Sequence, residues 1–195
     1  MTVLHYSALV VTRRAPQACR IEYFLVALPV ESIVLPMVHV GIGYDVHALV
    51  AGRKLILGGV AIPHLKGLEG HSDADVLMHA ICDAVLGALG EADIGHYFPN
   101  TDPQWKGAPS RVFLNEAARL ARVRQSRIVN VDATVIAQEP KIFPYIQQMK
   151  TNIAQALGLN AERVGIKATT NEHLGFIGRE EGIAAMAVAS VDLPQ

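Results

Sequence analysis

The 195-residue chain contains only two cysteines and one tryptophan. Cys19 and Cys82 cannot build a disulfide framework, and no Cys-x-x-Cys pair is present to bind a metal or to exchange electrons. An excess of positive charge is also missing, because 17 lysines and arginines face 18 acids, which argues against a nucleic-acid partner. So few cysteines fit a reducing compartment, and we expect a cytoplasmic protein.

The sequence has no apolar run long enough to span a membrane, which takes about 20 consecutive apolar residues. The most apolar part of the N-terminal segment, residues 23–37, is interrupted by Pro29, Glu31 and Pro36. The segment also lacks the clean apolar core and the cleavage site of a signal peptide. We therefore expect residues 1–36 to be a poorly ordered extension, and residues 37–195 to form one domain without a membrane partner.

Hydrophobic residues make up 51% of the chain, which is typical of a globular domain. Ser72, three residues before Asp75, resembles a capping box and predicts a helix start, whereas Gly58–Gly59 predict a bend inside a strand. We expect strands in residues 37–47, 54–63, 127–138, 163–170 and 183–193, and helices in residues 72–89, 110–122 and 144–157. This mixture predicts an α+β protomer, a mixed β-sheet with helices packed on one face.

The stretch "GIGYDVHAL", residues 41–49, contains a candidate metal site. Asp45 and His47 are two residues apart in a strand, so their side chains share a face. His79 is a candidate third ligand, because it lies between Asp75 and Asp83 at four-residue spacing on the predicted helix. A histidine among apolar neighbours is also often a satisfied core residue, so both interpretations stay open. One carboxylate and two imidazoles suit zinc and leave a fourth position free.

Other motifs fit known chemistries less well. The glycines of "GIGYDV" lack the third glycine of a dinucleotide fingerprint, since Val46 stands there, and no Gly-Lys-Ser or Gly-Lys-Thr is present. "GHSDA" approximates a nucleophile elbow, which would make Ser72 a hydrolase nucleophile, although a simple helix cap is the alternative. Thr169, Thr170 and Glu172 could hold phosphate oxygens and a divalent cation, or form an ordinary turn.

Five segments together resemble the 2-C-methyl-D-erythritol 2,4-cyclodiphosphate synthases of the non-mevalonate isoprenoid pathway. The segments are "GIGYDVHAL", "GGVAIPHLKGLEGHSDADVLMHAICDAVLGA", "DIGHYFPNTDP", "NVDATVIAQEPKI" and "KATTNEHLGFIGREEGIAAMAVA". The resemblance implies a metal-assisted lyase that cyclises 4-diphosphocytidyl-2-C-methyl-D-erythritol 2-phosphate and releases CMP. It also implies a homotrimer with active sites between neighbouring subunits.

The resemblance assigns roles to individual residues. Zn²⁺, or another divalent transition metal, is expected on Asp45, His47 and His79, and Mg²⁺ or Mn²⁺ at Glu172 with the substrate diphosphate. His71 and Thr170 match catalytic positions, Ser72 a phosphate contact, and Phe176 and Arg179 the lining of a central cavity with a possible regulatory isoprenoid-diphosphate site. The ribose and methylerythritol site is expected at Asp93, Ile94, Gly95, Phe98, Pro99, Asn100, Thr101 and Asp102. The cytosine pocket is expected at Ala137, Gln138, Glu139, Pro140, Lys141, Ile142 and Phe143, with Thr169, and Asn171 beside them.

Three positions depart from the family pattern. Asn100 stands where aspartate is common, Asn171 where threonine is common, and Glu139 where a small residue is common. Asp75 is expected to support a metal-binding histidine. Two alternatives use the same metal ligands: a zinc-dependent phosphoesterase, and a zinc-stabilised trimeric binding module without catalysis.

Overall fold

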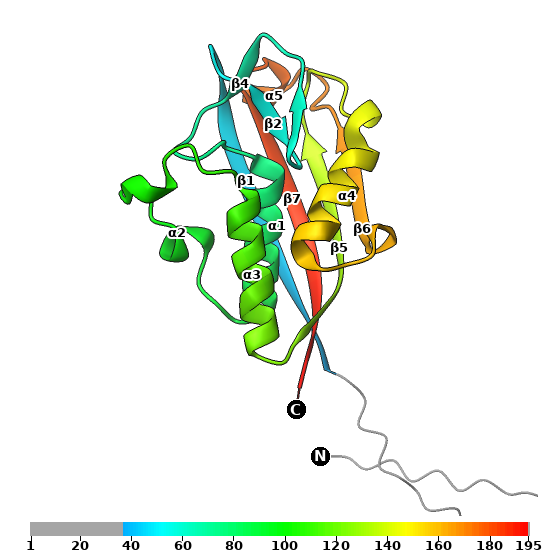
Figure 1. The fold of residues 1–195 in the computed structure, drawn as a ribbon. Helices are drawn as coiled ribbons and strands as arrows, with labels where there is room; N and C mark the ends of the chain where they lie inside the picture. The colour runs from blue at the N-terminus through cyan, green and yellow to red at the C-terminus, as the bar shows by residue number, and fades with distance from the viewer. Residues whose placement is uncertain (1–36, 195) are drawn as a thin grey trace, which may run out of the picture. The chain divides into compact units, whose positions relative to one another are not determined.

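The computed structural model describes residues 37–194, so the extension expected at 1–36 lies outside the described residues. These residues form a five-stranded sheet in the order β4-β1-β7-β5-β6 (Figure 1). β5 and β6 pair in parallel, and the other neighbours pair antiparallel. The strands are β1 (Met37–Ala51), β4 (Lys66–Leu68), β5 (Arg127–Ile136), β6 (Val164–Thr169) and β7 (Gly182–Leu193). The predicted α+β class with a mixed sheet is confirmed.

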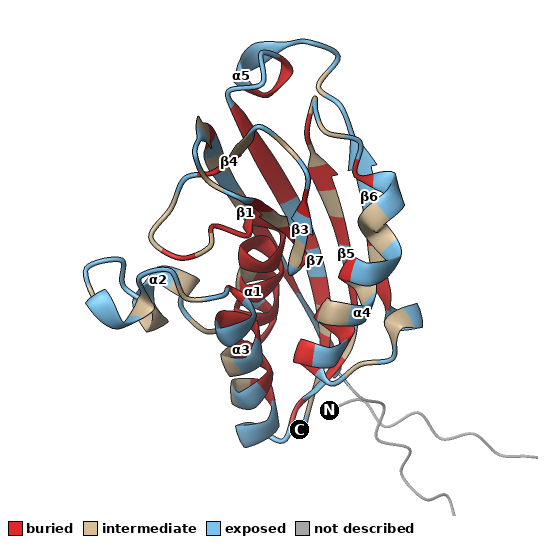
Figure 2. Ribbon diagram, turned by 45° about the horizontal axis from the view of Figure 1, so that its top comes forward, coloured by how far each residue is buried: buried red, intermediate tan, exposed pale blue. Residues whose placement is uncertain are grey.

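Three long helices cover one face of this sheet: α1 (Val76–Ala88), α3 (Arg111–Val123) and α4 (Ile146–Leu157). α1 packs on β1 and β7 and is covered by α3, so nearly all of it is buried (Figure 2). No helix in residues 37–194 is both long and apolar enough to cross a membrane. The remaining elements are short: α2 (Ile94–Tyr97), α5 (Gly175–Gly178), and the 3-10 helices η1 (Pro103–Trp105), η2 (Phe143–Tyr145) and η3 (Ala161–Arg163).

Two local predictions are wrong. The bend expected at Gly58–Gly59 is a full hairpin turn between β2 (Leu55–Leu57) and β3 (Val60–Ile62). Both glycines have positive φ, 55° and 70°, which matches the two-residue turns that favour glycine. The helix start expected at Ser72 is also displaced, because Asp75 caps α1 by accepting a hydrogen bond from Met78 N.

Asp75 joins this turn to the helix. Its Oδ1 accepts hydrogen bonds from Gly58 N at 2.9 Å and Met78 N at 3.1 Å, and its Oδ2 accepts one from Gly59 N at 2.6 Å. Burial raises the pKa of Asp75 to about 6, against the opposing effect of these three donors. Its hydrogen bonds go to backbone amides and not to a histidine, so the expected support of a metal-binding histidine is wrong.

Gly41 and Gly43 bring β1 into direct backbone contact with α1. A Cβ built on Gly41 would lie 2.1 Å from Ala84 O, and one on Gly43 would lie 1.9 Å from Ala80 O. Any larger residue would therefore push the helix off the strand. These glycines share the helix-facing side of β1 with Asp45 and His47, so the close approach is made directly beside the candidate metal ligands.

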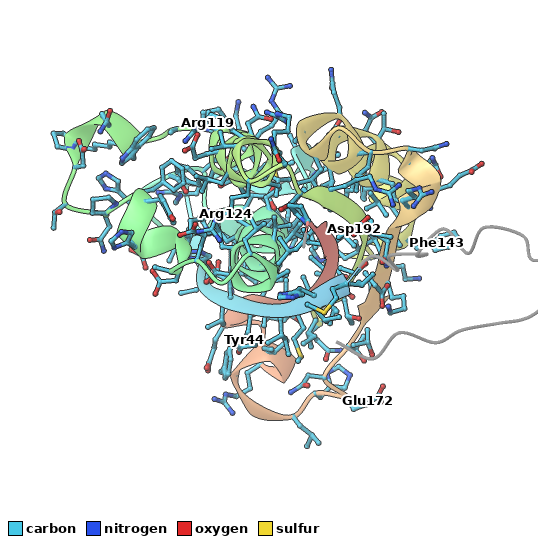
Figure 3. All side chains as sticks on the ribbon, turned by 90° about the horizontal axis from the view of Figure 1, so that it is seen from below. Tyr44, Arg119, Arg124, Phe143, Glu172 and Asp192 are labelled. Carbon is cyan, nitrogen blue, oxygen red and sulfur yellow. The ribbon has the colours of Figure 1, made fainter. Side chains whose placement is uncertain are left out.

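The opposite face of β1 and β7 is apolar and exposed. Tyr44 lies on the side of the sheet away from α1 and α3 (Figure 3). Exposed apolar residues gather here: Val38, Val40, Ile42, Tyr44, Val46, Met186 and Val188. A patch that follows two adjacent strands is larger than the single exposed apolar side chains that most monomeric proteins show. It marks a surface suited to contact with another protein chain.

The contact between β1 and α1 predicts opposite effects for two glycine substitutions. Gly43→Ala should destabilise the fold by about 1–3 kcal/mol or more, because the new Cβ overlaps the α1 backbone. Gly87→Ala, at the same interface but on the helix, meets Gly41 Cα at an ordinary 3.7 Å and should be neutral or stabilising. Urea unfolding of both variants measures the difference, and equal stabilities would contradict the close-contact argument.

Candidate active site

Asp45, His47 and His79 direct one ligand atom each toward a common point. Asp45 Oδ2 lies 3.0 Å from His47 Nε2 and 2.9 Å from His79 Nδ1, and the two nitrogens are 3.1 Å apart. The three form a group that could hold a metal ion, as the sequence predicted. Their side chains are 25%, 20% and 11% exposed, so the cluster is open to a further ligand on one side.

His79 satisfies both interpretations that its sequence environment allowed. Its residue exposure is only 8%, and its ring lies 5.8 Å from that of Phe113 within the core. Its Nδ1 nevertheless emerges at the cluster beside Asp45. The apolar neighbours therefore hold the ring in place, while one nitrogen remains available as a ligand.

The charges of the cluster are strongly coupled. Burial raises the pKa of Asp45, but hydrogen bonds and charge interactions with His47 and His79 outweigh it and hold that pKa well below its usual range. Burial lowers the pKa of His47, but the hydrogen bond and charge of Asp45 outweigh it and raise that pKa. The Asp45 carboxylate therefore favours positive charge at this point, either as a proton on His47 or as a metal cation.

The hydrogen bond of His47 Nδ1 determines which ring nitrogen can bind a metal. His47 Nδ1 lies 2.7 Å from Glu69 O, a carbonyl that only accepts, so Nδ1 carries a proton. A neutral His47 then presents the lone pair of Nε2 to the cluster, as a metal ligand must. The donor set and its orientation both fit a divalent metal.

His71 and Ser72 lie in the loop beside this cluster. Arg53 donates hydrogen bonds to Gly70 O at 3.0 Å and to Ser72 O at 2.8 Å, which fixes the loop. His71 Nε2 donates to Asp102 O at 3.1 Å and so connects to the next predicted segment. Ser72 is buried and its Oγ accepts from Ala74 N, an arrangement unlike the exposed serine of a nucleophile elbow.

The segment Asp93–Asp102 forms α2 and the loop after it. Asp83 on α1 accepts a hydrogen bond from Ile94 N at 2.8 Å, which ties the segment to the helix that carries His79. Phe98 packs on Phe113, whereas Pro99, Asn100 and Thr101 are exposed. The carboxylates of Asp93 and Asp102 cap α2 and η1. A pocket of about 530 Å³ lies between this segment and the exposed side of α3, and its lining includes Tyr97, Phe98 and Trp105 but none of the cluster residues.

A second group of predicted residues lies at the other edge of the sheet. Ala137 N donates to Thr169 O at 3.0 Å, so the segment 137–143 and the end of β6 are adjacent. Thr170 Oγ1 donates to Glu172 Oε1 at 3.0 Å, and Phe143 is 83% exposed. β7 and β5 separate β6 from β1. Glu172 is therefore not part of the Asp45 cluster within one chain.

Phe176 and Arg179 follow in α5 and directly after it. Phe176 is 44% exposed, and Arg179 forms an exposed ion pair with Glu181 at 2.9 Å. Asn171 Nδ2 donates to Leu174 O at 2.7 Å and so shapes the turn before α5. Asn171, which stands where threonine is common in the family, therefore stabilises this turn.

Sequence reasoning missed three residues around the cluster: Arg53, Asp73 and Ser110. Ser110 was expected only as a helix start, yet its Oγ lies 2.8 Å from His79 Nε2. Asp73 accepts a hydrogen bond from Ser110 N at 3.1 Å. The one available signal was the density of acids in "HSDAD", which identifies neither the partner nor the distance.

The sequence model of the YgbB family matches residues 38–192. The 2-C-methyl-D-erythritol 2,4-cyclodiphosphate synthase of Syntrophotalea carbinolica is 61% identical over 152 residues, which cover 78% of this chain and 93% of that protein. The bifunctional IspDF of Campylobacter jejuni superposes with a TM-score of 0.78 at 41% identity, over 83% of this chain but 44% of that longer one. The Plasmodium falciparum IspF–CDP complex gives 0.72 at 34% identity, covering 83% and 99%. On the strength of the family match and of these identities, the chain belongs to the YgbB family.

Proposed function

We propose that this chain converts 4-diphosphocytidyl-2-C-methyl-D-erythritol 2-phosphate into 2-C-methyl-D-erythritol 2,4-cyclodiphosphate in the non-mevalonate isoprenoid pathway. An oxygen of the 2-phosphate attacks the β-phosphorus, the bond from that phosphorus to the oxygen of CMP breaks, and CMP leaves. The enzyme is then a phosphorus–oxygen lyase carried by residues 37–195. The observation that carries the proposal is the convergent Asp45–His47–His79 cluster in a member of this family.

The reaction needs no nucleophile from the protein, because both reacting groups belong to the substrate. Catalysis then consists of positioning and of stabilising negative charge. Asp45, His47 and His79 are suited to hold Zn²⁺ or a similar transition metal, which when bound neutralises charge on the β-phosphate. His71 and Ser72 adjoin the cluster, with Thr170 and Glu172 expected to stabilise the diphosphate and its Mg²⁺ or Mn²⁺.

The nucleotide is placed in the second group of residues. The segment 137–143 with Thr169 offers backbone groups that suit the edge of a cytosine base, and one relative of known structure is a CDP complex. The segment Asp93–Asp102 is assigned to the ribose and methylerythritol. The substrate contacts of this chain would differ from the family pattern at two positions. These are Glu139, beside this pocket, and Asn100, in the exposed loop.

A homotrimer would unite the two groups of residues. Within one chain, the cluster on β1 and the pocket at β6 are separated by two strands, which is roughly 14 Å at the usual strand spacing. The exposed apolar face of β1 and β7 offers the surface for assembly. Neighbouring subunits would then combine one chain's cluster with the next chain's pocket, and Phe176 and Arg179 would line the central cavity.

The products distinguish a synthase from a phosphoesterase. Phosphorus NMR of the reaction should show a cyclic diphosphate together with CMP, whereas open-chain phosphates would favour the phosphoesterase and overturn the proposal.

His79→Ala should lower turnover by about 10²–10³-fold or more, because a metal ligand is lost. His64→Ala is the matched control, since the His64 ring hydrogen-bonds only to the backbone of Lys66 and lies outside the site.

Metal binding should release a proton. Because Asp45 raises the pKa of His47 in the metal-free protein, zinc competes with a proton for this ring, and zinc affinity falls as the pH drops through that raised pKa. Zinc calorimetry in buffers of different ionisation enthalpy should report proton release that grows as the pH is lowered through that pKa. Asp45→Asn removes the charge that raises this pKa, so weak zinc binding without proton release is expected for that variant.

The apolar face should control assembly. Ile42→Glu places a charge at a side chain that is 66% exposed on this face and should convert trimers to monomers. Val123→Glu, at a side chain equally exposed on α3, should leave the mass unchanged. Light scattering after size-exclusion chromatography measures both, and a trimeric Ile42→Glu protein would argue against this surface.

A further inference from the structure

Ser110 occupies the N-cap position of α3 but does not cap it. Serine is favoured at N-caps because its Oγ accepts a hydrogen bond from an amide in the first helical turn. No such bond is formed here, although Ser110 is only 1% exposed and its polar atoms need partners. Its Oγ instead contacts Asp73 Oδ1 and lies 2.8 Å from His79 Nε2.

The chemistry of these groups fixes the direction of the hydrogen bonds. As a carboxylate, Asp73 only accepts, and its Oδ1 also receives Ser110 N at 3.1 Å and Asp75 N at 3.2 Å. Ser110 must therefore donate its single hydroxyl proton to Asp73. Its Oγ is left with lone pairs only and accepts from His79, which places a proton on Nε2 of that ring.

In the metal-free protein Nδ1 faces two further acceptors, Asp45 Oδ2 at 2.9 Å and the Nε2 lone pair of a neutral His47 at 3.1 Å, and a cation that takes this place leaves Nδ1 as its ligand. We propose that Asp73 and Ser110 are positioning residues, which accept the hydrogen bond of His79 Nε2 and hold the ring in the orientation that binds metal through Nδ1. The pair does for His79 what the Glu69 carbonyl does for His47. This inference rests on the proposed metal function and deepens it.

Other neighbours of His79 cannot replace this pair. Ser72 Oγ is 3.4 Å from Nε2, longer than a good hydrogen bond, and it already accepts from Ala74 N. Phe113 lies against the ring and offers no acceptor from its side chain. Removal of the Ser110 hydroxyl therefore leaves Nε2 with only a weak partner in a buried place.

The zinc-loaded protein tests the inference without any substrate. Nitrogen-15 NMR of the full chain with zinc reports which nitrogen of His79 binds the metal and how fast the proton on the other nitrogen exchanges with water. The expected result is zinc on Nδ1 and a slowly exchanging proton on Nε2. Zinc on Nε2 would overturn the inference even if the enzyme is active, and the expected spectrum would stand even if the proposed reaction were wrong.

Variants then test whether the pair matters for metal binding. Ser110→Ala should weaken zinc affinity by about 10–100-fold, as loss of an outer hydrogen-bond partner of a ligand typically does. Asp73→Ala removes the acceptor that fixes the Ser110 hydroxyl, so zinc affinity should fall and the proton on His79 Nε2 should exchange faster with water. Ser126→Ala is the matched control, because Ser126 is also buried but its hydroxyl donates only to Arg124 O, away from the cluster.

The control should retain both the zinc affinity and the slow exchange of the Nε2 proton. A folded Ser110→Ala protein with unchanged zinc affinity and unchanged exchange would contradict the positioning role. Should that variant fail to fold, Asp73→Ala and the spectrum of the zinc-loaded unsubstituted protein still decide the question.

Discussion

The backbone contact between β1 and α1 is the constraint on which the cluster depends. Two residues along a strand and one turn along a helix cover similar lengths, about 7 Å and about 5 Å. Gly41 meets Ala84 and Gly43 meets Ala80. Asp45 follows Gly43 by two residues on the strand, and His79 directly precedes Ala80 on the helix, so both lie beside the last of these contacts. The ligands therefore meet because the two glycines keep the register and the spacing of the packed elements. The "GIG" sequence, which resembles part of a nucleotide-binding loop, instead allows β1 to pack directly against the backbone of α1.

Polar contacts then orient what the packing has brought together. Glu69 fixes one ring of the cluster, and Ser110 with Asp73 contacts the other. Asp83 and His71 tie the segment Asp93–Asp102 to the same region. Each of these contacts joins residues at least ten positions apart in the chain, so the site is held by the tertiary structure and not by any single motif. The second group of residues lies across the sheet, which leaves one chain with only part of the proposed site.

The sequence predicted what depends on local pattern. The long helices and the main strands follow from periodicity, and helix α4 ends at Gly158 in the left-handed conformation that glycine favours. Spacing offered Asp45, His47 and His79 as candidate ligands, and the family resemblance decided between the two interpretations of His79. Prediction from the sequence failed where the hydrogen-bond partner of a side chain lies far away in the chain. Asp75 replaces Ser72 as the helix cap because the amides of a turn sixteen or seventeen residues earlier also need an acceptor. Ser110 reads as an ordinary cap because nothing nearby in sequence reveals His79.

The close packing at Gly41 and Gly43 also limits which ions suit the cluster. Two ligands stand on a strand in the middle of a sheet, and the third stands on a helix whose backbone already touches that strand. An ion of larger radius would have to be accommodated by rotation of the three ligand side chains, since no side-chain layer between the two elements can yield. Discrimination among divalent cations by ionic radius would then depend in part on two residues that carry no ligand atoms and, as glycines, no side chains.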